Sequence, residues 1–150
     1  MLKNDHKTVR QLGRDFQRAG NKSQKSKLAQ QIVEELTVHA FVEEEVFYPA
    51  MLERLPKLEE TLLEAFEEHH VAKWLCAEVA SMKPDEERFD AKVMVLVELV
   101  RHHVEEEEGE LFPKIRKELG RKELTELAAE MEQIRKKAPR SPRPEPAVRG

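Results

Sequence analysis

The chain has 150 residues and a formal net charge of −4; 39% of its residues are hydrophobic and 37% are charged. That length suits one domain with its own core, the abundance of Ala, Leu, Glu, Lys and Arg favours an all-helical protein, and the acidic balance gives no general reason to expect nucleic-acid binding. Cys76 is the only cysteine, which excludes an intramolecular disulfide.

Apolar residues spaced three and four positions apart predict helices along most of the chain. The first two helices are expected at about residues 2–19 and 27–47, separated by the polar loop GNKSQKS. A connection bracketed by Pro49 and Pro56 follows, with a short helical turn at 50–54.

The second half of the chain repeats this pattern. Helices are expected at about residues 58–81 and 89–109, on either side of the turn signal KPDEER. The helix at 89–109 is expected to continue to Leu119, bent at Pro113 and ended by Gly120. The four long helices together predict an all-α, up-down-up-down four-helix bundle.

We expect this bundle to span residues 1–120 and to be followed by an additional short amphipathic helix at 121–137. The remaining residues, 138–150, are rich in proline and arginine and should form a disordered tail. The apolar side of the additional helix holds Leu124, Leu127, Ala128, Met131 and Ile134.

No apolar run approaches the roughly 20 residues needed to cross a bilayer. The N-terminal MLKNDHKTVRQL is too polar for a signal peptide, and a single cysteine suits a reducing compartment. We therefore expect a soluble cytoplasmic protein.

Two segments of the chain share one pattern of chemistry. HAFVEEEVFYP begins at His39 and HVEEEEGELFP begins at His103, and both carry His, Glu, Glu and Pro at the same spacings. The offset is constant, since 103 − 39, 107 − 43 and 113 − 49 all equal 64. A constant register indicates that one structural device occurs twice.

On a helix, residues i and i+4 lie on one face, so His39 projects with Glu43 and His103 with Glu107. All four are in line with apolar residues rather than on the polar side of their helices. Because an unpaired buried carboxylate is very costly, these groups need partners, and a metal centre would satisfy all of them.

The other two helices offer further histidines. His6 lies on the apolar face of the first helix, and the third carries the adjacent pair His69 and His70. We favour His69, because the His70 stripe also carries Lys73. His102 forms its own i,i+4 pair with Glu106, so only the repeat favours His103. The predicted metal ligands are His6, His39, Glu43, His69, His103 and Glu107.

Six ligands are too many for tetrahedral zinc, which takes four. Carboxylates can bridge two metals and imidazole suits iron, so a two-iron centre fits this set. Ferritin-like bundles use Glu-x-x-His spacings, whereas the order here is His-x-x-x-Glu.

The combination of DH at 5–6, HAFVE at 39–43, EEHH at 67–70 and HVEEE at 103–107 resembles the haemerythrin-like, or HHE cation-binding, proteins. The resemblance covers about residues 1–119. It implies two non-haem iron ions with an oxo or hydroxo bridge, histidines as terminal ligands, and Glu43 and Glu107 as bridges. Manganese is the less favoured metal. The resemblance also implies reversible binding of dioxygen, reaction with peroxide or nitric oxide, or sensing of oxygen and iron.

The chain departs from the oxygen-carrying branch of that family. Those proteins have a fifth histidine ligand one turn before the third-helix histidine, where this chain has Ala65. They also place five residues between the last histidine and an aspartate. The remaining coordination position could be filled by His70, Glu44, Glu108 or water.

Several residues have simpler interpretations. Of the four residues Glu105 to Glu108, we expect only Glu107 to leave the solvated face. Trp74 is expected in the core, Tyr48 in helix-end packing, and Cys76 as a buried structural thiol, although its position near His69 keeps a place beside the metal open.

The predicted function is binding or reaction of O2, H2O2 or NO at a diiron centre, for sensing, storage or stress protection. One alternative is an enzyme that decomposes peroxide or reduces nitric oxide. Another is a helical adaptor without redox function, which binds a protein partner through its C-terminal helix or basic tail. No membrane or nucleic-acid partner is expected.

Overall fold

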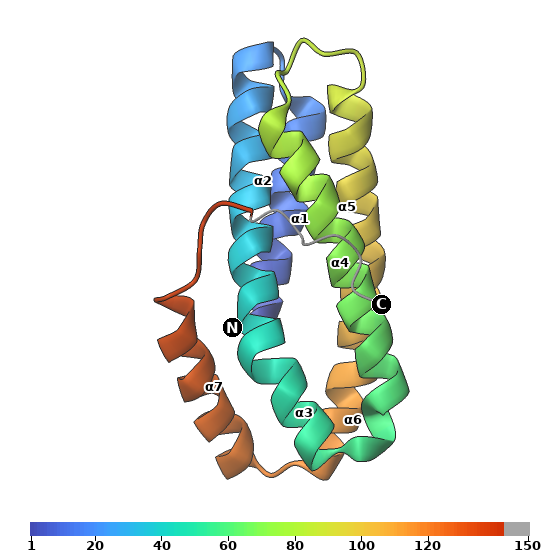
Figure 1. The fold of residues 1–150 in the computed structure, drawn as a ribbon, viewed down its shortest axis with the longest axis vertical. Helices are drawn as coiled ribbons and strands as arrows, with labels where there is room; N and C mark the ends of the chain where they lie inside the picture. Colours follow the sequence, from blue (N-terminus) through green and yellow to red (C-terminus); the bar gives the residue numbers. More distant parts are fainter. Residues whose placement is uncertain (143–150) are drawn as a thin grey trace.

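The computed structural model describes residues 1–142, which are helical over most of their length and form no strand. Four long helices run alternately up and down, as Figure 1 shows, so the predicted all-α four-helix bundle is confirmed. They are α1 (Leu2–Arg18), α2 (Lys22–Val42), α4 (Glu59–Ser81) and α5 (Phe89–Glu106).

The second helix starts earlier than predicted, at Lys22 rather than near Lys27. Asn21 is its N-cap, and the Asn21 side chain accepts a hydrogen bond of 2.9 Å from the amide of Gln24. Such a cap satisfies one of the amides that a helix start leaves without a partner. Most of the polar stretch at 20–26 is therefore the exposed first turn of α2.

The predicted end of the second helix at Phe47 is a boundary between two helical segments, and not the break in the helix that was expected around Pro49. A π-helical segment η1 (Glu43–Phe47) follows α2 and passes directly into α3 (Tyr48–Arg54). Proline has no amide hydrogen for the carbonyl four residues earlier. The wider π turn provides a different pairing, in which the amide of Tyr48 donates to the carbonyl of Glu43.

The same construction occurs 64 residues later. The π-helical segment η3 (Glu107–Leu111) follows α5 and leads into α6 (Phe112–Glu118), where the amide of Phe112 donates to the carbonyl of Glu107. The predicted helical continuation toward Leu119 is confirmed. Two π segments in one register show that the sequence repeat is also a structural repeat.

Two apolar clusters fill the bundle, one on each side of a polar layer. In α1, Leu2 belongs to one cluster and Val9 to the other, with His6 between them. In α2, Leu36 and Val42 flank His39 in the same way. Apolar packing on both sides therefore holds the histidine layer at a fixed height in the bundle.

A 3-10 turn, η2 (Pro56–Leu58), joins α3 to α4, and α7 (Arg121–Arg135) runs back along the bundle from the end formed by α3 and α6 (Figure 1). Leu127 and Met131 of α7 are buried, and the helix packs against η1 and α2. The amphipathic character predicted for this helix is confirmed. Of the predicted disordered tail, residues 143–150 lie outside the described part of the chain.

Trp74 is not in the core as predicted, because 62% of its surface is exposed. It lies five positions after His69, which is a rotation of about 140° around a helix. Since His69 of α4 faces the interior of the bundle, Trp74 must face outward. Within residues 1–142, no helix is long and apolar enough to cross a membrane.

Candidate metal centre

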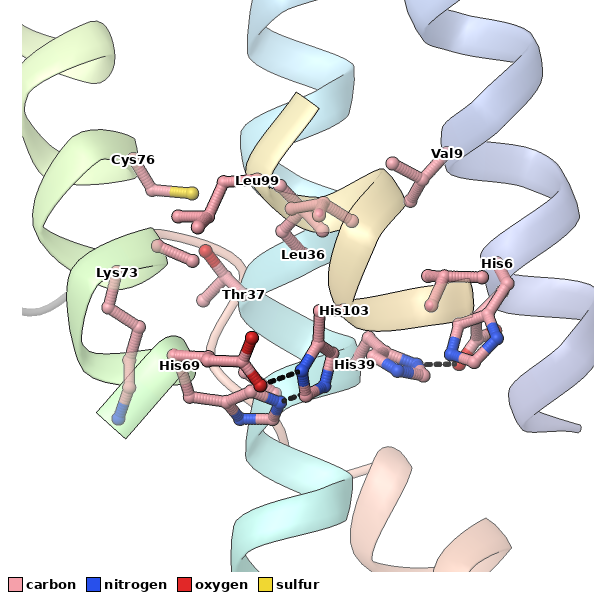
Figure 2. A pocket seen from close by; sticks show the side chains of 16 residues that line it. His6, Val9, Leu36, Thr37, His39, His69, Lys73, Cys76, Leu99 and His103 are labelled. Carbon is pink, nitrogen blue, oxygen red and sulfur yellow. Dashed lines mark hydrogen bonds and ion pairs between the residues drawn. The ribbon is translucent and has the colours of Figure 1, made fainter. Parts of the chain in front are cut away.

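Four histidines, one from each long helix, form a buried layer across the bundle. Figure 2 shows His6, His39, His69 and His103 in a row beneath the side chains of Val9, Leu36, Leu99 and Cys76. The rings of His6 and His39 lie 4.9 Å apart, and so do those of His69 and His103. The choice of His69 over His70 and of His103 over His102 agrees with this layer, as His70 is only partly buried and His102 is exposed.

Each histidine turns Nε2 toward the centre and donates from Nδ1 to a carboxylate behind it. A bond of this kind fixes both the tautomer and the ring orientation of a metal-binding histidine. The Nδ1–oxygen distances are 2.7 Å for His6–Glu108, 2.8 Å for His39–Asp5, and 3.0 Å for both His69–Glu44 and His103–Glu68.

Two glutamates occupy the middle of the layer. Glu43 is fully buried, and its Oε1 lies 3.1 Å from Nε2 of His39 and 3.0 Å from Nε2 of His69. Glu107 is 2% exposed; its Oε1 lies 3.2 Å from Nε2 of His6 and its Oε2 lies 3.4 Å from Nε2 of His103. Each carboxylate therefore joins two histidines from different helices.

The six predicted ligands form two overlapping groups that share Glu43, each compact enough to hold one metal ion. One group is His6, His39, Glu43 and Glu107, and the other is Glu43, His69 and His103. Carboxylates that reach two groups are suited to bridge two metals. Imidazole nitrogens and carboxylate oxygens are common protein ligands for divalent metals, so this donor set fits metal binding.

Unsatisfied polar atoms support the same assignment. Among the described residues, four buried side-chain atoms lack a hydrogen-bond partner: His6 Nε2, His39 Nε2, Glu43 Oε2 and Glu107 Oε1. The short distances from both Nε2 atoms to carboxylate oxygens are thus close approaches without hydrogen-bond geometry. Buried polar groups without partners are costly, so their concentration at one point fits a site built for a cation.

Without a metal, the carboxylates strongly perturb the histidines. Burial alone would lower the pKa of His39 and of His103, but the charges of Glu43 and Glu107 and the hydrogen bonds to carboxylates outweigh it and raise both to about 10. Burial opposes ionisation of Glu43 as well, yet the charge of His39 and the close contacts with His39 and His69 hold the pKa of Glu43 well below its usual range. The histidines and the central glutamates therefore stabilise one another's charged forms.

Tyr48 also belongs to the centre, which the sequence analysis did not predict. Its hydroxyl donates to Oε2 of Glu107 at 2.6 Å, lies 3.1 Å from Nε2 of both His69 and His103, and lies 3.3 Å from Oε1 of Glu43. Burial and the charges of Glu43 and Glu107 raise the pKa of Tyr48 well above its usual range, so the phenol keeps its proton.

The residues suggested for an additional coordination position lie elsewhere. Glu44 and Glu108 face the Nδ1 atoms of histidines, not the centre of the layer. His70 lies near Glu67 at the surface, where Nδ1 and Oε2 are 3.7 Å apart. The prediction that Glu108 is solvated is wrong, because its hydrogen bond to His6 holds the side chain in a partly buried position.

Three of the carboxylates behind the histidines also contact a basic side chain. Arg10 lies beside Glu108 with a nitrogen–oxygen distance of 3.3 Å, and Lys73 lies beside Glu44 at 2.7 Å. Arg135 of α7 forms an ion pair with Asp5. Each chain of contacts runs from the surface to a histidine and ends at the central glutamates.

A small apolar cavity of about 40 Å³ opens onto the histidine layer. Its walls include Ala72 and four residues that Figure 2 labels above the histidines: Val9, Leu36, Leu99 and Cys76. Burial raises the pKa of Cys76 to about 12, so its thiol stays protonated. The prediction of a buried thiol is confirmed, and Cys76 contributes apolar surface to the cavity.

Comparison with known families agrees with this geometry. The model of the haemerythrin HHE cation-binding domain matches residues 1–115, which include all six predicted ligands and both π segments. The chain belongs to this family. Its members are helical metal-binding proteins, so metal binding is the function that the family supports for this chain.

The relatives extend the likeness over nearly the whole chain. A DNA nickase of Nostoc is 29% identical over 91% of this chain, and a haemerythrin-like protein of Schizosaccharomyces pombe is 26% identical over 90%. The chain spans 38% of the length of the first and 67% of the second. The crystal structure of an HHE domain-containing protein from Mycobacterium kansasii has a TM-score of 0.71 at 25% identity, over 91% of this chain and 85% of that one.

Proposed function

We propose that the chain holds two iron ions in this layer and uses them to bind or react with a small molecule such as O2, H2O2 or NO. The observation that carries this proposal is the arrangement of four Nε2 atoms and two carboxylates around one buried point, with four polar atoms there lacking hydrogen bonds. Two carboxylates per centre suit a pair of metals, and imidazole suits iron. In the cell, such a protein would serve sensing, storage or protection against oxidants.

The residues of the chain have separable roles in this proposal. The four histidines and the two glutamates would hold the metals, and Glu43 and Glu107 would bridge them. Asp5, Glu44, Glu68 and Glu108 would keep a proton on each Nδ1, so that Nε2 remains free to bind metal. Two iron ions would supply the electrons that a small oxidant or nitric oxide requires.

The cavity supports a small, weakly polar ligand. Its volume of about 40 Å³ admits a molecule little larger than water, and its walls are mainly aliphatic. A larger or charged substrate would have to displace packed side chains or lose its hydration. The same walls would limit access of bulk water to the layer.

The test is a reaction of anaerobic, ferrous-loaded protein with O2, NO or H2O2, followed by absorption spectroscopy. We expect Ala72→Leu, which fills the cavity, to slow the spectral change without lowering iron content. Ala80→Leu, at an exposed position of the same helix, is the matched control. Iron-loaded wild-type protein that gives no spectral change with any of the three molecules would contradict the proposal.

Catalytic turnover is a second candidate, favoured by the Tyr48 hydroxyl. The hydroxyl lies 2.6 Å from Glu107 and could hydrogen-bond a reacting molecule held in the layer. Repeated consumption of peroxide or nitric oxide by substoichiometric protein, slowed in Tyr48→Phe, would support an enzyme. A single stoichiometric reaction would favour binding or sensing.

A further inference from the structure

Helix α7 lies beyond the matched family domain at residues 1–115, yet its last residue contacts Asp5, which hydrogen-bonds His39 of the metal centre. The Nη2 atom of Arg135 forms an ion pair with Oδ2 of Asp5. The same oxygen accepts the 2.8 Å hydrogen bond from Nδ1 of His39. Arg135, Asp5 and His39 therefore form one continuous chain of charge-assisted contacts.

Burial makes this chain of contacts more than a surface ion pair. Asp5 is 8% exposed and His39 is 7% exposed. Because Asp5 is buried and only 26% of the Arg135 side chain is exposed, water screens this ion pair less than it screens a pair at the surface.

Packing fixes where Arg135 lies. Leu127 and Met131 anchor α7 in the apolar cluster that also contains Tyr48 and Val42. The arginine follows Met131 by one helical turn, on the side of α7 that faces the bundle. Its position is thus set by the helix as a whole.

The other basic residues behind the histidines come from the bundle itself. Arg10 lies on α1, the helix of His6, and Lys73 lies on α4, the helix of His69. Asp5 differs because its cation comes from α7. His39 is thus connected to a helix that lies outside the four-helix bundle.

We propose that Arg135 is a positioning residue for the metal centre and that, acting through Asp5, it limits electron donation by His39. The proposal rests on metal binding by His39, as put forward above. With Arg135 present, the carboxylate of Asp5 interacts with both the guanidinium and the imidazole, so it accepts a weaker hydrogen bond from Nδ1 of His39. Without Arg135, Asp5 draws more on that proton, His39 becomes a stronger donor, and the ferric state is favoured.

The test compares Arg135→Met with Arg135→Lys in the full-length, iron-loaded protein. We expect iron content to stay unchanged, the midpoint potential to fall in Arg135→Met, and Arg135→Lys to restore most of the wild-type value. In an Asp5→Asn background, Arg135→Met should have no further effect, because the carboxylate that connects it to His39 is gone. Arg54→Met is the matched control, because it removes the ion pair between Arg54 and Glu123 of α7 without touching the centre.

A metal-free readout separates this proposal from metal binding itself. In the NMR spectrum of metal-free protein, the Nδ1 proton of His39 should move downfield in Arg135→Met and stay in place in Arg54→Met. That shift would be measurable even if the protein bound no iron. The proposal would be overturned if Arg135→Met and Arg54→Met changed the potential and the proton shift equally. It would also be overturned if Arg135→Met lowered the potential as much in Asp5→Asn as in wild type. Either result would mean that α7 affects the centre only through packing.

Discussion

Tyr48 and Phe112 occupy equivalent positions in the two halves of the repeat, 64 residues apart, yet only Tyr48 brings a hydroxyl into the histidine layer. The Phe112 ring stacks beside His6, with centroids 6.1 Å apart, whereas the Tyr48 ring lies beside His69 at 5.1 Å. The two halves of the centre are therefore chemically different, although their histidines and glutamates match.

Replacing Tyr48 by Phe should destabilise the metal-free protein by about 1–3 kcal/mol, because the buried carboxylate of Glu107 loses its hydroxyl donor. Urea denaturation in the presence of a chelator measures the change. Phe47→Leu, beside Tyr48 but without a polar group to lose, controls for altered packing. A Tyr48→Phe protein as stable as wild type would show that the hydroxyl contributes no net stabilisation.

The adjacent histidines give two internally controlled pairs. We expect His69→Ala and His103→Ala to lower metal content strongly, and His70→Ala and His102→Ala to leave it near the wild-type value. The first two side chains are buried in the layer, whereas His70 is partly exposed and His102 lies at the surface beside Glu106. Metal content per chain, measured after identical reconstitution, shows which histidine of each pair binds metal. Loss of metal in His70→Ala or His102→Ala alone would reverse the assignment.

Stability of the metal-free protein should decrease as the pH rises above neutral. His39 and His103 have pKa values of about 10 in the folded chain, against an ordinary value of 6.5. A raised pKa stabilises the folded state fully below about pH 6.5, and this contribution is lost as the pH rises through about 10. Denaturation of chelator-treated protein across this range measures it. A free energy of unfolding that rises with pH would contradict the raised values.

The same raised pKa values predict proton release when metal binds, because Nε2 must lose its proton to become a ligand. Calorimetric titration of metal in buffers with different ionisation enthalpies would report the number of protons released. Loading that releases none would mean that the histidines are already neutral, or that the metal binds elsewhere.

The apolar spacing along four long helices predicted the bundle. The repeated spacing of His and Glu predicted two of the histidines and both glutamates of the layer, because a regular helix places i and i+4 on one face. Tyr48 escaped prediction because the π turn at Glu43–Phe47 changes that period. In a regular α-helix, Tyr48 would be rotated about 140° from Glu43, whereas the wider turn brings both to the interior. Two prolines at the same place in the repeat were the available signal for this irregularity.

The roles of Asp5 and Arg135 could not be predicted from the sequence for another reason. Asp5 precedes His6 by one residue, and the sequence pattern offered no sign that it would bond a histidine on another helix. Arg135 depends on how α7 docks, which is a property of tertiary packing and not of helical periodicity. Trp74 shows the converse, since the predicted inward position of His69 already placed Trp74 about 140° away on the outer side of α4, although its size suggested the core.

The most direct test of the central claim is the metal content of wild-type protein beside Glu43→Ala and Glu107→Ala, after anaerobic reconstitution with ferrous iron. Glu45→Ala and Glu105→Ala, which change exposed neighbours, are the matched controls. Two bridging carboxylates predict about two irons per chain in wild type and both controls, and a marked loss in each of the other variants. Unchanged iron in Glu43→Ala and Glu107→Ala, or no iron in wild type, would contradict a diiron centre in this layer.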